Sequence, residues 1–129
     1  MSHPASVFLA IFVGGGLGSI LRHGVNQACA ALFGVHFPSG TLVVNIVGSL
    51  AMGLVAGWFA FRGDGPMLRL FLTTGVLGGF TTFSAFSLDA ALLWERGQTV
   101  GAALYAGGSV VAGIIGVFAG LSLMRTLLS

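Results

Sequence analysis

The sequence predicts an all-α membrane protein in which residues 1–129 form a single four-helix transmembrane domain. Three observations support this fold class. Hydrophobic residues account for 56% of the 129 residues and charged residues for only 6%, whereas a soluble domain carries about 25% charged residues. The mean hydropathy is +1.03. The chain also contains four long apolar stretches, each long enough to cross a bilayer, which takes about 20 apolar residues in a helix.

Short polar segments divide the four apolar stretches. Pro38 marks the first of them, residues 62–66 (Arg-Gly-Asp-Gly-Pro) form the second, and residues 95–98 (Glu-Arg-Gly-Gln) form the third. Glycine and proline at this density favour turns. Strands of a membrane barrel would show as alternating segments of about ten residues, which are not visible here, so we expect helices. The predicted spans are about residues 6–33, 40–61, 67–94 and 99–127.

The scarcity of charge excludes several classes of protein. Five arginines and three acids give a net charge of +2, which is too little for a nucleic-acid-binding surface. The single cysteine, Cys29, excludes an internal disulfide and a four-thiolate metal site. No serine has a histidine or an acid placed to activate it, so we expect no enzyme.

The first span has no basic residue before it and no Ala-x-Ala site at its end, so we expect a retained helix instead of a signal peptide.

The arginines are distributed unevenly between the two sides of the predicted bundle. With four spans, both termini and the loop at residues 62–66 share one side. That side carries three arginines: Arg62, Arg69 and Arg125. The other side carries Arg96, and Arg22 if it lies close enough to that end. Basic residues favour the cytoplasmic side, but this bias is weak, so we expect insertion in both orientations and hence an antiparallel dimer. A single orientation is the alternative.

Pairs of glycines four positions apart occur in three of the spans. Such pairs let helix backbones approach closely, and a bundle of only four helices offers few walls for a polar pathway. Both observations favour self-association, and neither locates the interface. The pairs are Gly14/Gly18, Gly53/Gly57 and Gly116/Gly120.

The third span contains a segment that is poorly suited to a continuous helix. Gly78 and Gly79 precede the β-branched pair Thr81 and Thr82, and both residue types have low helix propensity. We therefore expect the third helix to be broken mid-membrane around residues 78–82. Irregular backbone is tolerated at that depth where it is buried in protein or lines a cavity. Carbonyls of one half-helix would suit a cation, and amides of the other an anion; a kink that only aids packing is the alternative.

Hydroxyl groups and two aromatic rings gather around this predicted break. Phe83 and Phe86 are three residues apart and share a helix face, and the edge of a phenyl ring carries the positive part of its quadrupole. The two rings could face a small anion, or they could pack in the core or against lipid. The hydroxyl-bearing residues nearby are Thr81, Thr82, Ser84 and Ser87.

Polar residues at helical spacing also mark the second and fourth spans. Thr41, Asn45 and Ser49 follow one another at four-residue intervals and form one stripe. An unpaired amide is costly in hydrocarbon, so Asn45 either bridges helices or lines a pathway. In the fourth span, Tyr105 and Ser109 have the same spacing.

Two charged residues stand out within the spans. Arg22 is the strong charge of the first span, and Asp89 is the only acid of the third. Charges inside a membrane mark functional sites and usually have a partner. Two arrangements remain open, an ion pair between these residues or a place for each at a vestibule.

Three motifs together closely resemble the Fluc (CrcB-type) fluoride channels. The first is Gly-Gly-x-x-Gly-Ser-x-x-Arg, which ends at Arg22. The second is Gly-Thr-Leu-x-Val-Asn at residues 40–45, and the third is Gly-x-x-Gly-Gly-x-Thr-Thr-Phe-Ser-x-Phe at residues 75–86. The third motif is long and very specific. Span count, length and loop sizes match the family over essentially the whole chain.

This resemblance implies an antiparallel, dual-topology homodimer with two fluoride pores and a structural sodium ion at its centre. The family holds sodium by backbone carbonyls at two crossing helix breaks, which implies the carbonyls of Gly78 and Thr81 here. The resemblance also implies fluoride contacts from Phe83 and Phe86, and a donor role for Asn45. We expect further hydroxyl groups to line the pathway, at Thr41, Thr82, Ser84, Tyr105 and Ser109.

Two charged residues also match family positions, and two other residues differ from the family pattern. Arg22 matches the family arginine near the vestibule, and Asp89 stands where a glutamate is often found. Ala85 lies where threonine is common, and Gly113 lies where some relatives have serine, so each departure removes a hydroxyl from or near the pore.

The family role is passive efflux of fluoride across the inner (plasma) membrane of a prokaryote. The alternative is a small dual-topology proton-coupled exporter, which needs an acid deep in the bundle.

Overall fold

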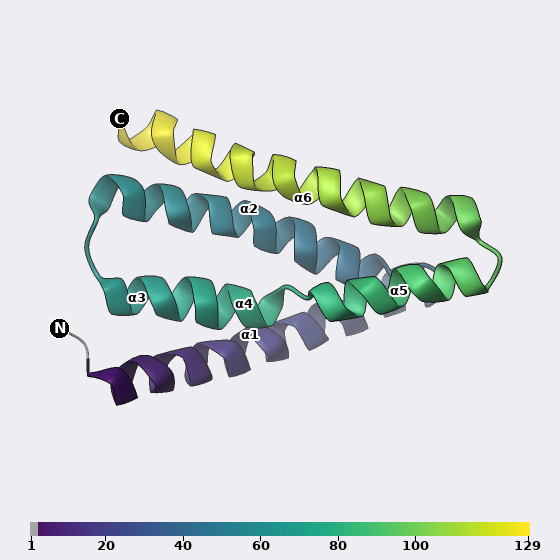
Figure 1. The fold of residues 1–129 in the computed structure, drawn as a ribbon, viewed down its shortest axis with the longest axis horizontal. Helices are drawn as coiled ribbons and strands as arrows, with labels where there is room; N and C mark the ends of the chain where they lie inside the picture. The colour runs from purple at the N-terminus through teal and green to yellow at the C-terminus, as the bar shows by residue number, and fades with distance from the viewer. Residues whose placement is uncertain (1–2) are drawn as a thin grey trace.

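The computed structural model describes residues 3–129 as helices joined by short connections (Figure 1). The first, second and last helices are continuous, whereas the third apolar segment, Pro66–Glu95, is divided into shorter pieces. All four segments are long and apolar enough to cross a membrane, which confirms the predicted all-α class and the four spans. The elements are α1 (Pro4–Phe33), α2 (Ser39–Arg62), α3 (Pro66–Leu70), η1 (Phe71–Leu77), α4 (Gly78–Phe80), α5 (Phe83–Glu95) and α6 (Thr99–Leu128).

Glycine ends two of the long helices. Gly34 follows α1 with φ +82°, and its amide donates to the carbonyl of Ala30 at 2.9 Å. Gly63 follows α2 with φ +67°, and its amide donates to the carbonyl of Phe59 at 2.8 Å. Glycine adopts positive φ without the steric penalty of other residues, and the turn predicted at residues 62–66 is present.

The helices α2 and α6 pack side by side (Figure 1) with glycines at the contact. A Cβ atom on Gly120 would lie 2.6 Å from the amide nitrogen of Leu54, and one on Gly53 would lie 3.0 Å from the Cα of Val117. A larger residue at either position would push the helices apart. The glycine pairs predicted in these two spans therefore pack α2 against α6 within one chain.

The helix α1 packs against η1 and α4 in the same way. A Cβ atom on Gly14 would lie 2.7 Å from the carbonyl oxygen of Phe71, and one on Gly18 would lie 2.8 Å from the amide nitrogen of Phe80. This pair brings the backbone of α1 directly against the third segment. Since packing within one chain accounts for all three pairs of spaced glycines, they no longer support self-association.

Gly18→Ala is expected to destabilise the protein. The added methyl group would overlap the carbonyl oxygen of Val76, and overpacking of this kind costs about 1–3 kcal/mol. Gly24→Ala is the matched control, because Gly24 lies in the same helix with nothing within 4 Å of its Cβ position. Thermal unfolding in detergent should show a lower midpoint for Gly18→Ala alone. Equal midpoints for the two variants would contradict the close packing of α1.

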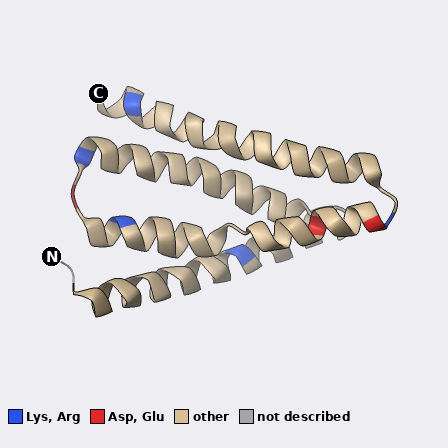
Figure 2. Cartoon of the chain, in the orientation of Figure 1, with Lys and Arg blue, Asp and Glu red and all other residues tan. Residues whose placement is uncertain are grey.

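Charged residues lie mainly toward the two ends of the long axis (Figure 2). The start of α1, the end of α6 and the α2–α3 connection share one end (Figure 1), and the α5–α6 connection with Arg96 lies at the other. Three arginines belong to the elements that meet at the first end: Arg62, Arg69 and Arg125. The uneven distribution predicted for the arginines is therefore present in the fold.

The third segment is interrupted between α4 and α5, where Figure 1 shows a thin connection. Thr81 (φ −86°, ψ 157°) and Thr82 (φ −150°, ψ 121°) both have extended backbone. They lie half-way along Pro66–Glu95. The preceding element, η1, is wound as a π-helix, a form found mostly in short stretches and often at functional sites.

The glycines before this interruption have a role that the sequence did not predict. Gly78 remains helical, with φ −62° and ψ −38°, so the chain leaves the helix at the threonines. A Cβ atom on Gly79 would lie 3.1 Å from the Cα of Gly15. Gly79 therefore allows α4 to contact α1, and the β-branched threonines adopt the extended conformation that suits them.

Candidate ion pathway

Asn45 on α2 holds the interrupted segment of the third helix. Its Nδ2 donates to the carbonyl of Thr82 at 3.1 Å, and its Oδ1 accepts from the amide of Thr82 at 2.9 Å. One side chain thus pairs both backbone groups of a residue outside the helices, where such groups are costly to leave unpaired. The bridging role that the sequence left open for Asn45 is observed, and Asn45 also lines a cavity.

The neighbouring residue, Thr81, is hydrogen-bonded to the end of η1 and packs against α2. The amide and the Oγ1 of Thr81 both donate to the carbonyl of Leu77, at 3.0 and 2.9 Å. The methyl group of Thr81 fills the space where a Cβ atom on Gly48 would lie. Gly48 is a site residue that the sequence analysis missed. Its position three residues after Asn45, on the same helix face, was the available signal.

Arg22 on α1 contacts the interrupted segment at α4. Its Nε donates to the carbonyl of Gly79 at 3.1 Å. Of the two arrangements that the sequence left open, the pairing of Arg22 with Asp89 is not observed. Asp89 instead accepts a hydrogen bond from the Tyr105 hydroxyl at 3.2 Å.

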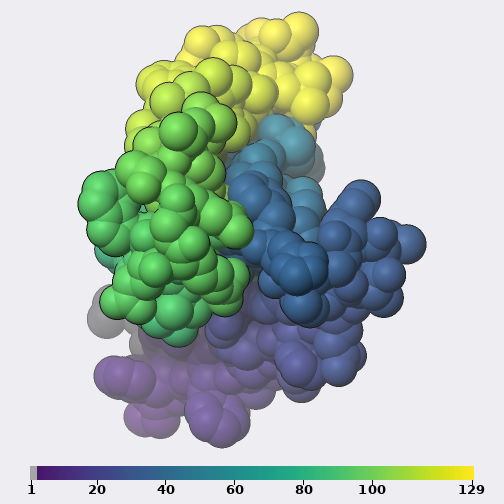
Figure 3. All heavy atoms as spheres, turned by 90° about the vertical axis from the view of Figure 1, so that its right-hand side faces the viewer, coloured from purple at the N-terminus to yellow at the C-terminus, as the bar shows by residue number. Residues whose placement is uncertain are grey.

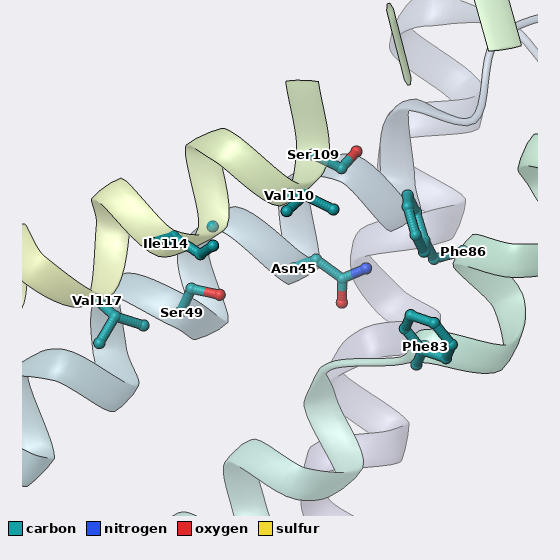
Figure 4. Close-up of a pocket in the computed structure, with 9 residues that line it drawn as sticks. Asn45, Ser49, Phe83, Phe86, Ser109, Val110, Ile114 and Val117 are labelled. Atoms are coloured by element: carbon teal, nitrogen blue, oxygen red, sulfur yellow. The ribbon is translucent and has the colours of Figure 1, made fainter. Parts of the chain in front are cut away.

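A cavity of about 280 Å³ lies beside Asn45, among α2, α5 and α6 (Figure 4). Phe83 and Phe86 form one side of it, with ring centroids 5.8 Å apart and 48° between the ring planes. Figure 4 shows the Asn45 side chain pointing toward these rings. None of the described lining residues is charged; they are Asn45, Ser49, Phe83, Phe86, Ser109, Val110, Gly113, Ile114 and Val117.

A second cavity of about 270 Å³ shares part of this lining and reaches the interrupted segment. It shares Asn45, Phe83 and Phe86 with the first cavity and adds Thr81 and Thr82. The structure therefore gathers predicted pathway residues from three separate spans around one region.

The two phenylalanines have different surroundings. Phe83 is 79% exposed on the single chain. Phe86 is half-buried and packs on Tyr105, with ring centroids 5.3 Å apart and 41° between the planes. Phe86 therefore supports the α5–α6 contact and also lines the cavity. Phe83 lines the cavity without such a packing contact.

The hydroxyl groups beside the cavity also differ. Ser109 is 9% exposed, and its Oγ has no hydrogen-bond partner within the part of the chain that the structure describes. Buried polar atoms without a partner are rare, so Ser109 is available to a ligand or a water molecule. Thr82 uses its Oγ1 to accept from the amide of Ala85 at 3.1 Å and lies 3.4 Å from the Oγ of Ser84. Thr82 therefore caps α5.

Other predicted residues lie toward the end of the bundle that faces the viewer in Figure 3. There α5 and the start of α6 (green) lie beside the start of α2 (blue). A cavity of about 330 Å³ at this end is lined in part by Thr41, Ala85 and Asp89. Tyr105 is buried, and its hydroxyl donates to Asp89, one of these lining residues. The predicted pathway residues thus form two groups, one at the interruption and one at this end.

The interruption also leaves backbone carbonyls without their helical partners. In a continuous helix the amide of Thr82 would bond the carbonyl of Gly78, but it donates to Asn45 instead. Carbonyl oxygens freed in a broken helix suit a small cation. Within residues 3–129, no group of three or more His, Cys, Asp or Glu side chains could hold a metal.

The α6 wall of the first cavity was not predicted. Val110, Ile114 and Val117 line it and share one face of α6, next to Ser109 and Gly113. Their spacing was visible in the sequence. Apolar residues in an apolar span carry no signal that separates a cavity wall from a lipid-facing surface, so the tertiary structure was needed to find them.

Comparison with known proteins indicates the same family as the three sequence motifs, over nearly the whole chain. The model of the family described as "CrcB-like protein, Camphor Resistance (CrcB)" matches residues 9–121. The chain is 61% identical over 121 residues to "Fluoride-specific ion channel FluC 2" of Nitrobacter hamburgensis, covering 93% of this chain and 98% of the relative. It is 64% identical over 118 residues to "Fluoride-specific ion channel FluC" of Methylobacterium nodulans, covering 91% and 94%.

A further relative, "Fluoride-specific ion channel FluC" of Novosphingobium aromaticivorans, is 57% identical over 123 residues, covering 94% of this chain and 96% of the relative. The resemblance inferred from the three motifs is confirmed at the level of the family. With matches this extensive and this similar, the chain belongs to the CrcB family.

Proposed function

We propose that this protein is a fluoride-selective ion channel that gives passive efflux of toxic fluoride. One structural observation carries the proposal. The amide of Asn45 and the ring pair Phe83 and Phe86 meet at an uncharged cavity beside the interrupted third helix. The relatives that share this sequence are named fluoride-specific ion channels, so we infer that the protein is a channel and not an enzyme.

The chemistry of the cavity suits a small, strongly hydrated anion. Such an ion must exchange water for close donors. These would be the Ser109 hydroxyl, the second Nδ2 hydrogen of Asn45 and the ring edges of Phe83 and Phe86. A cationic side chain in the wall would hold the ion tightly, whereas conduction needs weak binding at several sites. The uncharged lining therefore favours passage.

The functional unit in this proposal is an antiparallel, dual-topology homodimer with two pores. The cavity beside Asn45 opens on the surface of the single chain, and Phe83 is 79% exposed there, so a second chain would be needed to complete the wall. The interrupted residues Thr81 and Thr82 lie half-way along the third segment, which corresponds to mid-membrane. The weak arginine bias permits insertion in both orientations.

A structural sodium ion at the centre of the dimer belongs to the same proposal. The carbonyls of Gly78 and Thr81 from each subunit would hold it, and the diverted amide of Thr82 supports this assignment. Four carbonyl oxygens from two crossing breaks would provide neutral ligands for a small cation. The ion would stabilise the interface without contacting fluoride.

The proposed location is the inner (plasma) membrane of a prokaryotic cell, with four spans in the bilayer. Fluoride enters cells as its neutral acid and is trapped as the anion. A passive channel therefore suffices for export, because the anion leaves down its own electrochemical gradient.

Reconstitution into liposomes with a fluoride electrode tests this function. We expect fast fluoride efflux once the membrane potential is dissipated, negligible chloride efflux, and no requirement for a proton gradient. Chloride flux comparable with fluoride flux would contradict the proposal. Strict coupling to protons would support the small dual-topology exporter instead, with Asp89 as the acid in the third span.

A further inference from the structure

Two side chains from different helices hold the interruption in the third segment. Asn45 on α2 pairs both backbone groups of Thr82, and Arg22 on α1 donates through Nε to the carbonyl of Gly79 at 3.1 Å. The family resemblance implies a different role for Arg22, as a charge at the vestibule. The observed hydrogen bond points to a role in the architecture of the break.

The glycines of α1 and α4 create this contact. Gly18, one turn before Arg22, lies so close to α4 that a Cβ atom on it would be 2.8 Å from the amide nitrogen of Phe80. Gly79 also lies close to α1, where its Cβ would be 3.1 Å from the Cα of Gly15. Because the two backbones are in contact, Arg22 reaches the Gly79 carbonyl with Nε, the donor of its side chain that lies nearest the backbone.

The carbonyl of Gly79 needs this donor because the helix ends there. In a continuous helix it would accept from the amide of Phe83, but Phe83 begins α5 on the far side of Thr81 and Thr82. The last carbonyls of a helix carry partial negative charge, and an arginine donor is a favourable partner for them.

We propose that Arg22 is a positioning residue, whose Nε–H fixes the Gly79 carbonyl and thereby the end of α4. This inference rests on the proposed function, since it assigns Arg22 a role in conduction that depends on the hydrogen bond instead of the charge. Arg22 holds the break at α4, and Asn45 holds it at Thr82. The neighbouring carbonyls of Gly78 and Thr81 keep their orientation only while both contacts persist.

Three substitutions separate the hydrogen bond from the charge. The Nε2 of glutamine stands at the same position along the side chain as the Nε of arginine, so Arg22→Gln keeps a donor and removes the charge. Arg22→Met keeps an apolar stem and removes both. Arg22→Lys keeps the charge and moves the donor one bond further out. Arg96→Gln is the control, because it removes an exposed charge at the α5–α6 connection.

In the liposome assay, Arg22→Gln should retain fluoride flux within about threefold of the parent, whereas Arg22→Met should lose about tenfold or more. Arg22→Lys should fall below Arg22→Gln, and Arg96→Gln should match the parent. A role as a vestibule charge predicts the reverse order, with Arg22→Lys active and Arg22→Gln as weak as Arg22→Met. It also predicts a parent flux that declines with ionic strength, because salt screens exposed charges. That pattern would overturn the proposal.

Hydrogen exchange provides a readout that does not depend on transport. The amides of residues 78–83 should exchange faster in Arg22→Met than in the parent or in Arg22→Gln, while those of α6 stay unchanged. Equal exchange at residues 78–83 in all three proteins would overturn the positioning role even if the parent conducts fluoride. If the parent conducts no fluoride but this exchange pattern is found, the proposed function fails and the contact of Arg22 with the break stands.

Discussion

Asn45→Ala is expected to lower fluoride flux about tenfold or more. It is also expected to destabilise the protein, because each unpaired buried polar group costs about 1–3 kcal/mol. The substitution leaves the amide and the carbonyl of Thr82 without their partner. It also removes the amide that faces Phe83 and Phe86 across the cavity. Efflux from liposomes and thermal unfolding in detergent measure the two effects separately.

Ser49→Ala is the matched control for this substitution. Ser49 lies one turn further along α2 and lines the same cavity, whereas the two hydrogen bonds to Thr82 come from Asn45. We expect Ser49→Ala to unfold at the midpoint of the parent. Parent-like flux in Asn45→Ala, or an equal loss of stability in both variants, would show that the bridge to Thr82 does not matter.

Phe83→Ile is expected to lower fluoride flux about tenfold or more while leaving the unfolding midpoint close to that of the parent, because exposed side chains contribute little to stability. Phe83 is 79% exposed, so the change removes an aromatic edge from the cavity and little packing. Phe86→Ile should lower both quantities. Phe86 packs on Tyr105, and an aromatic pair contributes about 0.5–1.5 kcal/mol beyond its buried area.

Phe12→Ile provides the comparison for a general effect of exposed aromatic residues. Phe12 lies in α1 and is 78% exposed, so it matches Phe83 in exposure and differs in position. Its substitution should leave fluoride flux unchanged. Equal losses in Phe12→Ile and Phe83→Ile would assign the effect to contacts with lipid. Parent-like flux in both Phe83→Ile and Phe86→Ile would remove these two residues from the pathway.

Local properties of the chain explain which parts of the fold could be predicted. Hydropathy and turn residues are properties of single segments, so the four spans and the turn at residues 62–66 follow from the local sequence alone. The interrupted region was also visible, because Thr81 and Thr82 are poor helix formers. The role of Gly79 was not visible, since a glycine that breaks a helix and one that allows a close contact look the same in sequence.

The candidate site was predicted in part for the same reason. Helical spacing placed Thr41, Asn45 and Ser49 on one face, and the motif at residues 75–86 placed the phenylalanine pair beside the interruption. Spacing within one helix cannot say which neighbour it meets. The lining residues of α6 and the space that Gly48 leaves for Thr81 therefore appeared only when the helices were packed together.

The sequence by itself determined the class of protein, the number of spans and the segment where the third helix ends, because each depends on residues close together in the chain. Only the tertiary structure decided what holds that segment in place. Arg22 bonds Gly79 and Asn45 bonds Thr82 because glycines let α1 approach α4 and α2 accommodate Thr81. Hydrogen-bond partners in an apolar bundle depend on which backbones touch, and that contact is a property of the packed helices together.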